Sequence, residues 1–267
     1  MTTPDVYAVY AVRYAHSGER PPKHNFIFAD AHDGPSAMDY FVWAAVGESR
    51  SFVIDMGFNR ETAEKRGHDY LRCPAESLTH VDLDAASVED VIITHMHWDH
   101  VGNFDKFPKA RFHLQESEAQ FVTGRYMSHK VMRGGFAVDD ACEMVRQVYA
   151  DRVEFHDGEA ELASGFSVHH AGGHTMGHQF ARVYTRRGWV VLASDAAHYY
   201  ANMEQGNPFP AIYSVGENLA SFRLARRLAE SGRHVIPGHD PLVLQRYPPP
   251  SPELEGVVVR LDVDPKE

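Results

Sequence analysis

Three histidines and one aspartate lie within six residues of this chain, and this cluster constrains the fold more than any other feature. The segment THMHWDHVGN carries the pattern H-x-H-x-D-H on His95, His97, Asp99 and His100. The cluster follows the apolar run Val91–Thr94, so we expect it on the loop that leaves a buried strand. Imidazole and carboxylate groups are ligands of divalent zinc, manganese or iron. Because four ligands this close can hardly all reach one ion, the pattern predicts a site for two ions.

A site for two ions needs more donors, and three candidates follow later apolar runs. His174 lies in AGGHTMGHQ, Asp195 follows WVVLAS, and His239 follows VIPG. Polar residues at strand ends are where sites on layered α/β folds gather. Each of the three could by itself be an ordinary turn residue or helix cap. Together they supply the missing donors, and the two oxygens of Asp195 suit it to bridge two ions.

The composition excludes several other classes of protein. The 267 residues are 43% hydrophobic and 24% charged, which is typical of a globular chain. The formal net charge of −11, with neutral histidine, disfavours nucleic acid as a partner. Two cysteines are too few for a disulfide framework. No apolar run is long enough to span a membrane and the N-terminal segment does not read as a signal peptide, so we expect a cytoplasmic protein.

The order of the expected elements predicts a mixed α/β (α+β layered) fold. Strand-like runs come first, a few helices follow, strands return from Val153, and a helix is expected over Glu217–Ser231. This order lacks the strict alternation of a doubly wound sheet. No stretch resembles a linker, so we expect one domain over residues 1–267.

One segment breaks the pattern of regular elements. From Thr123 the chain reads TGRYMSHKVMRGGFAV, with a flexible pair at Gly134 and Gly135. We interpret residues 123–150, which end in an expected helix over Asp139–Tyr149, as an insertion. It is either a lid or a plain surface excursion packed by its own methionine and phenylalanine residues.

The motifs THMHWDH, GGHTMGHQ, SDAAH and PGHD, in this order, resemble those of the metallo-β-lactamase-fold hydrolases. The chain is most similar to the N-acyl-homoserine-lactone lactonase group, over about Phe52 to His239. The resemblance implies a four-layer αβ/βα sandwich with its site at one edge of the inner sheets. It also implies that Asp55, in IDMGF, supports the metal loops.

The resemblance implies a complete set of ligands. It places His95, His97 and His174 on one metal, Asp99, His100 and His239 on the other, and Asp195 between the two. A histidine at position 100 and the lack of a cysteine near Asp195 disfavour the antibiotic-hydrolysing relatives. A histidine at position 97, where the flavo-di-iron reductases carry a glutamate, disfavours membership of that group.

One position departs from the family pattern. Three residues after Asp195 the best-known lactonases carry a tyrosine that contacts the substrate carbonyl, whereas this chain has His198. A histidine can donate a hydrogen bond to a developing oxyanion, or it can simply pack against its neighbours. Trp98, Tyr199 and Tyr200 are the expected substrate contacts.

The implied reaction is the opening of a lactone by a hydroxide that bridges two divalent metals, with Asp99 orienting the hydroxide and moving its proton. Zinc is the first candidate, with manganese, iron or cobalt as others. The partner is a small lactone or ester, and the chain is a monomer or a homodimer.

Two alternatives stay open. One is hydrolysis of another ester, a thioester or a cyclic amide at the same site; the other is a non-catalytic metal-binding module.

Overall fold

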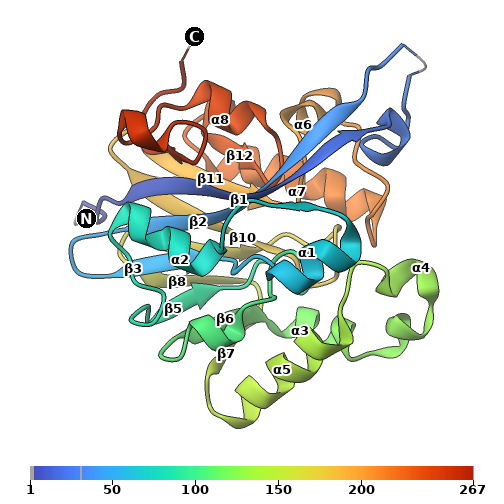
Figure 1. Cartoon of the computed structure of the whole chain (residues 1–267), viewed down its shortest axis with the longest axis horizontal. Helices are drawn as coiled ribbons and strands as arrows, with labels where there is room; N and C mark the ends of the chain where they lie inside the picture. The colour runs from blue at the N-terminus through green and yellow to red at the C-terminus, as the bar shows by residue number, and fades with distance from the viewer. Residues whose placement is uncertain (1–2, 31, 267) are drawn as a thin grey trace.

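Two β-sheets face each other in the computed structural model, which describes residues 3–30 and 32–266 (Figure 1). The first sheet has the strand order β13-β1-β2-β3-β5-β6-β7, and β4 pairs with β1. Its β13-β1-β2-β3 part is antiparallel and its β3-β5-β6-β7 part is parallel. The strands of this sheet are β1 (Ala8–Arg20), β2 (Ser36–Val46), β3 (Ser51–Ile54), β4 (Asp69–Tyr70), β5 (Asp90–Ile92), β6 (Arg111–Gln115), β7 (Val153–His156) and β13 (Val258–Arg260).

The second sheet has the order β12-β11-β10-β9-β8. It is antiparallel except for β11 and β12, which run parallel. Its strands are β8 (Glu159–Ala163), β9 (Phe166–His170), β10 (Gln179–Thr185), β11 (Gly188–Ser194) and β12 (Val235–Pro237).

Helices lie on the outer sides of the two sheets (Figure 1). Helix α2 packs on β1 of the first sheet and α7 packs on β11 of the second. The helices are α1 (Arg60–Arg66), α2 (Pro74–Ser77), α3 (Glu116–Val122), α4 (Lys130–Arg133), α5 (Val138–Tyr149), α6 (Tyr200–Gln205), α7 (Val215–Leu228) and α8 (Leu242–Arg246). No helix of the described part combines the length and the apolar character needed to cross a bilayer.

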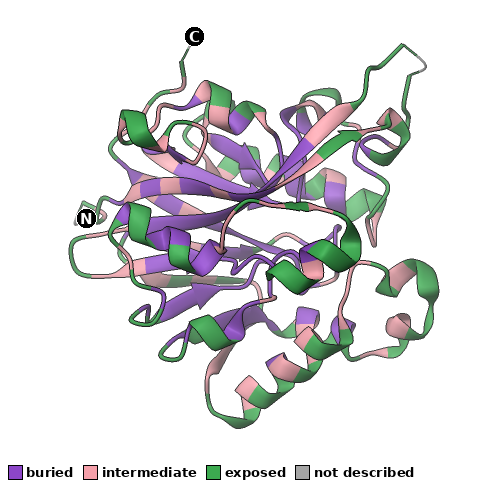
Figure 2. Cartoon of the chain, viewed as in Figure 1, coloured by how far each residue is buried: buried purple, intermediate pink, exposed green. Residues whose placement is uncertain are grey.

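The core between the sheets is aromatic and aliphatic. Phe52 of the first sheet stacks on Phe166 of the second, with ring centroids 3.9 Å apart, and Tyr7 meets Phe166 edge-on. Figure 2 shows that buried residues follow the strands, while exposed residues mark the outer sides of the helices. Burial of these apolar faces is the main force that holds the layers together. The layered α/β fold expected from the sequence is therefore confirmed.

Some expected boundaries are wrong. The last long helix was expected over Glu217–Ser231. It begins at Val215, where Ser214 caps it by accepting from the Glu217 backbone N–H at 3.4 Å, and it ends at Leu228. It stops early because the Glu230 N–H donates to the carbonyl of Trp189 in β11, a tertiary bond that local sequence does not encode. Strand β8 and helix α6 had no expected counterpart.

The topology explains why distant polar residues meet. Parallel strands present their carboxyl ends at the same edge of a sheet. Asp55 follows β3, the H-x-H-x-D-H loop follows β5, Asp195 follows β11, and His239 follows β12. The strand order thus delivers Asp55, the clustered ligand segment and two of the later donors to one edge of the stacked sheets.

Candidate metal centre

Three histidine rings converge at the first part of the site. The Nε2 atom of His174 lies 3.0 Å from Nε2 of His95 and 2.9 Å from Nδ1 of His97. The Nδ1 atom of His174 faces the carbonyl of Ala211 at 2.8 Å, and a carbonyl only accepts. In the neutral ring, Nε2 of His174 therefore carries a lone pair directed at the other two rings. Burial lowers the pKa of His97 to about 4 and that of His174 well below its usual value, so both rings are neutral.

The second part of the site combines a carboxylate with two more histidines. Nε2 of His239 lies 3.6 Å from Oδ2 of Asp99, and Nε2 of His100 lies 3.5 Å from the same oxygen. The other ring nitrogen of each histidine is already engaged, since Nδ1 of His239 donates to the carbonyl of Asp39 and Nδ1 of His100 faces Asp55 at 2.7 Å. The remaining nitrogens thus face the interior of the cluster.

Asp195 lies between these two groups. Its Oδ2 atom is 3.5 Å from Nε2 of His174, and its Oδ1 atom is 3.0 Å from Nε2 of His239 and 3.6 Å from Nε2 of His100. Burial raises the pKa of Asp195, but His239 and the other surrounding imidazoles outweigh burial and hold it well below the usual value. The carboxylate is therefore ionised and faces histidine ring nitrogens on both sides.

The donor set fits two divalent cations. Ligand atoms of His95, His97 and His174, and separately those of Asp99, His100 and His239, lie within 4.8 Å of one another. Nε2 of His100 is buried without a hydrogen-bond partner. Buried polar atoms without partners are costly, and lone pairs facing one another are stabilised by a cation between them. The structure thus brings together all seven residues expected as ligands.

Asp55 supports the ligand loop from the end of β3. It has a left-handed backbone conformation, with φ of 63°, and is fully buried. Its carboxylate accepts from the backbone N–H of Thr94 and from the Thr94 hydroxyl, each at 2.8 Å, and it holds Nδ1 of His100. This arrangement fixes the ring of His100 with Nε2 directed at the cluster.

Glu118 is a supporting residue that sequence reasoning missed. It is fully buried at the start of α3 and bonds to both ligand loops. Its carboxylate accepts from the backbone N–H groups of Met96 and Gly177, each at 2.9 Å, and from the Thr175 hydroxyl at 2.6 Å. Because Met96 lies between two ligand histidines and Thr175 follows His174, one side chain sets the spacing of the two loops.

A cavity of 340 Å³ opens onto the cluster. Six of the residues proposed for the chemistry line it, and apolar residues from α3, from the segment around α4 and from the segment before α7 line it as well. The former are His97, Asp99, His174, Asp195, His198 and His239; the latter include Phe121, Val131, Met132, Phe136 and Ile212.

Only some of the residues expected to contact substrate line the cavity. Trp98 and His198 line the cavity. Tyr199 and Tyr200 do not: the Tyr199 hydroxyl donates to the carbonyl of Ala37, and Tyr200 lies under the Arg246 guanidinium. The expectation for these two tyrosines is corrected because they begin α6, which turns their rings into the packed interior. His178 is buried beside the rings of His95 and His174 but lies outside the groups of clustered donors.

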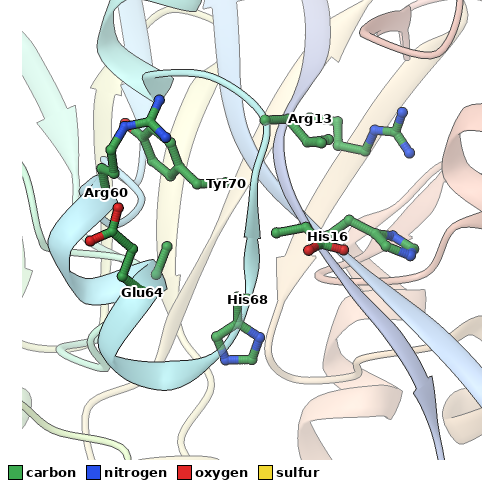
Figure 3. Close-up of a pocket in the computed structure, with 9 residues that line it drawn as sticks. Arg13, His16, Arg60, Glu64, His68 and Tyr70 are labelled. Carbon is green, nitrogen blue, oxygen red and sulfur yellow. The ribbon is translucent and has the colours of Figure 1, made fainter.

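A larger cavity of 590 Å³ lies between β1, α1 and β4 (Figure 3). None of the clustered histidines lines it. Its cationic side chains already have partners. Arg13 and His16 pair with Asp39, and Arg60 stacks over the ring of Tyr70 at 4.8 Å. Size alone therefore does not identify the functional site.

Two stacked mixed sheets with a histidine and aspartate cluster at their strand ends define the metallo-β-lactamase fold. Residues 36–239 match the family model described as the metallo-beta-lactamase superfamily, and the chain belongs to that superfamily. The family expected from the motifs is thus confirmed.

The curated relatives are named N-acyl homoserine lactonases. AttM of Azorhizobium caulinodans is 28% identical over 169 residues, which cover 60% of either chain. A Bacillus sp. relative is 25% identical over 153 residues, 56% of this chain and 55% of that one. The matched part therefore spans less than two thirds of the length of these relatives.

Solved structures share the fold over most of their length. A quorum-quenching N-acyl homoserine lactone lactonase is 18% identical, with a TM-score of 0.73 over 90% of this chain and 94% of that one. AidC, described as a dizinc quorum-quenching lactonase with a bound product, is 14% identical, with a TM-score of 0.72 over 90% of each chain. At these identities the likeness concerns the fold.

Gly135 provides a test of how closely the 123–150 segment fits the site. A Cβ atom on Gly135 would lie 2.5 Å from Nε2 of His97, and the Gly135 carbonyl accepts from the Trp98 backbone N–H at 2.9 Å. We expect Gly135→Ala to displace the His97 ring and to lower metal affinity by roughly the 10- to 100-fold that follows loss of a partner next to a ligand. Metal titration monitored by calorimetry measures this change.

The matched control is Gly134→Ala. Its added Cβ would meet only the Lys130 carbonyl, at an ordinary 3.7 Å. Equal metal affinity in the two variants would contradict close packing of this segment on His97.

Proposed function

We propose that this chain is a metal-dependent lactonase that holds two divalent cations. The observation that carries the proposal is the position of Asp195, whose two oxygens face separate groups of donors on either side. The names of the curated relatives and of the similar structures support the same assignment.

The resemblance of the motifs supplies the ligand set, and the geometry supports it. His95, His97 and His174 would hold one cation, Asp99, His100 and His239 the other, and Asp195 would contact both. Zinc is the first candidate because nitrogen and oxygen donors suit it and a similar structure is described as dizinc. When bound, the cations would lower the pKa of water in the site and polarise the carbonyl of an ester.

Asp99 is placed to move a proton during the reaction. Its backbone carbonyl accepts from the Tyr14 hydroxyl at 2.8 Å, which fixes the turn that carries it. Its Oδ2 atom faces His100 and His239, and the side chain lines the cavity. A carboxylate held by one oxygen can take the proton of an attacking water with the other and return it to the leaving alkoxide.

His198 presents a hydrogen-bond donor to the site. Its ring stacks on Phe209, with centroids 3.4 Å apart, and Nε2 lies 3.0 Å from Oδ2 of Asp195. Burial lowers the pKa of His198 to about 4, so the ring is neutral and one nitrogen carries a proton. With Nε2 protonated, this N–H donates to Asp195. Because the neutral ring has a single N–H group, a developing substrate oxyanion would have to share it with Asp195 as a bifurcated hydrogen bond.

Removal of this donor is expected to slow turnover without removing metal. His198→Phe keeps a flat ring against Phe209 but has no N–H group. Loss of one donor to an oxyanion typically lowers kcat by about 100-fold or more. Steady-state kinetics and metal content by plasma mass spectrometry measure the two effects, and unaltered kinetics would leave His198 with a packing role only.

The substrate class is tested with a panel. A metal-replete preparation is offered N-acyl homoserine lactones, simple γ-lactones, glutathione thioesters, cyclic amides and phosphodiesters. The proposal expects turnover of the lactones, and the apolar wall of Phe121, Met132 and Phe136 favours those with an acyl chain. Turnover confined to thioesters, amides or phosphodiesters would overturn it.

Other features of the protein remain proposals. We infer that residues 1–267 act as one domain, because both sheets contribute to one buried core. The 123–150 segment would be the lid, since Gly135 and Phe136 contact the ring of His97.

The free cysteines Cys73 and Cys142 suit a protein of the cytoplasm. The net charge of −11 argues against nucleic acid as a partner. The chain would be a monomer or a homodimer.

A further inference from the structure

The wall of the metal-site cavity contains one arginine without an ionic partner. Arg20 lies at the end of β1 and lines the cavity together with His198 and Asp195. Its guanidinium donates to the sulfur of Met38 at 2.9 Å. Among the described residues no carboxylate lies within 4.0 Å of Arg20, whereas Arg13 and Arg50 each have an aspartate partner within that distance.

Arg20 is also close to the groups next to the reacting centre. Burial raises the pKa of Tyr199 to about 12, and the nearby Arg20 charge acts in the opposite direction. Tyr40, which lines the same cavity, contacts the His239 ring edge-on at 5.1 Å. The cation therefore belongs to the chamber that holds the metal ligands and not to the outer surface.

With two divalent cations bound, the side chains and ions that line this cavity would carry a net positive charge. The only acidic side chains among the described residues that line it are Asp99 and Asp195, both proposed ligands. Two carboxylates cannot neutralise two divalent cations, so nothing remains to balance Arg20. In a chain with a net charge of −11, this chamber is a local site for anions.

We propose that Arg20 forms an anion-binding subsite and that the preferred substrates are lactones that carry a carboxylate apart from the ester to be opened. This inference rests on the proposed lactonase function and narrows its substrate class. The guanidinium offers paired N–H groups that match a carboxylate in a bidentate geometry. A neutral acyl chain would leave this cation unpaired beside two metal ions.

The test compares two lactones that differ in one charge. Both are α-amino-γ-butyrolactones with the same N-acyl chain, which ends in a carboxylate in one and in its methyl ester in the other. The wild-type protein is expected to show kcat/KM about 10- to 100-fold higher for the carboxylate, the range of one charge-assisted hydrogen-bonded pair, mainly through KM. Arg20→Gln should bring this ratio close to one, and Arg20→Lys should restore part of it.

Binding provides a readout that does not depend on turnover. The corresponding γ-lactams, first checked for resistance to hydrolysis by this protein, are titrated by calorimetry into wild-type protein, Arg20→Gln and Arg60→Gln. The carboxylate lactam should bind the wild type about 10- to 100-fold more tightly than its ester, and Arg20→Gln should lose this preference. Arg60, which stacks on Tyr70 in the other cavity, is the matched control and should keep it.

The outcomes separate the two proposals. If both lactones are opened equally well and both lactams bind equally, the Arg20 subsite is overturned while the lactonase function stands. If neither lactone is opened but Arg20 still selects the carboxylate lactam, the subsite stands and the function fails. An equal loss of affinity for both lactams in Arg20→Gln would assign Arg20 to the structure of the wall and overturn the subsite.

Discussion

Asp195→Asn is expected to abolish metal binding at one or both positions and, with it, hydrolysis. The substitution keeps the size of the side chain but removes the negative charge that faces His174 on one side and His239 on the other. An amide offers one carbonyl oxygen and an NH₂ group that cannot ligate, so the shared contact is lost. The loss should exceed the roughly 100-fold typical of a residue next to a ligand.

The measurement is metal content per chain together with turnover of a lactone. His169→Gln is the matched control, because His169 is also a buried histidine but lies on β9 outside the cluster and bonds to Ser167 at 2.9 Å. This control should keep its metal content and its activity. Two metal ions per chain and full turnover in Asp195→Asn would contradict the central role of this carboxylate.

Removal of metal by a chelator is expected to end turnover and to lower the melting temperature together. Without cations, Asp99 and Asp195 lie buried beside ring nitrogens that are directed at them, and buried polar groups that have lost their partner destabilise the folded chain. At a metal concentration about 1,000 times Kd, binding stabilises a folded protein by about 4 kcal/mol, which corresponds to about 10 °C for a chain of this size.

Calorimetric melting and lactone assays follow this change before and after chelation. Added zinc should restore both properties, and Asp195→Asn should show a much smaller shift in melting temperature on chelation. Full lactonase turnover in a preparation verified to be free of metal would rule out the proposed chemistry.

The proposed ligands could be picked out from the sequence because their signal is local. His95, His97, Asp99 and His100 lie in one short segment after an apolar run, and His239 follows another apolar run directly. The local sequence around each of these residues therefore predicts both its role as a donor and its position at the end of a strand. The resemblance of the motifs to a known family then supplied the pairing of the ligands.

The supporting residues could not be found in this way because their partners are far apart in the chain. Glu118 accepts from Met96, 22 positions away, and from Gly177, 59 positions away. Nothing in the segment QESEAQF distinguishes this glutamate from Glu116, which the structure leaves exposed. Arg20 likewise reads as an ordinary charged residue at the end of a strand.

Tyr199 and Tyr200 show that a position next to a predicted site residue does not guarantee contact with the site. Their position next to a predicted site residue favoured contact with substrate, but helix α6 begins there and turns both rings away from the cavity. Neighbours in sequence point in different directions when a strand gives way to a helix, since the direction of successive side chains changes with the backbone.

By itself the sequence determined the chemical types of the proposed ligands, their places at strand ends and the layered class of the fold, since apolar periodicity and donor spacing are local properties. Only the tertiary structure decided which distant groups meet: Glu118 between two loops, Gly135 against His97, and Arg20 alone in the cavity wall. The physical reason is that hydrogen bonding, packing and charge balance depend on distances in space, which the strand order and the stacking of the sheets establish.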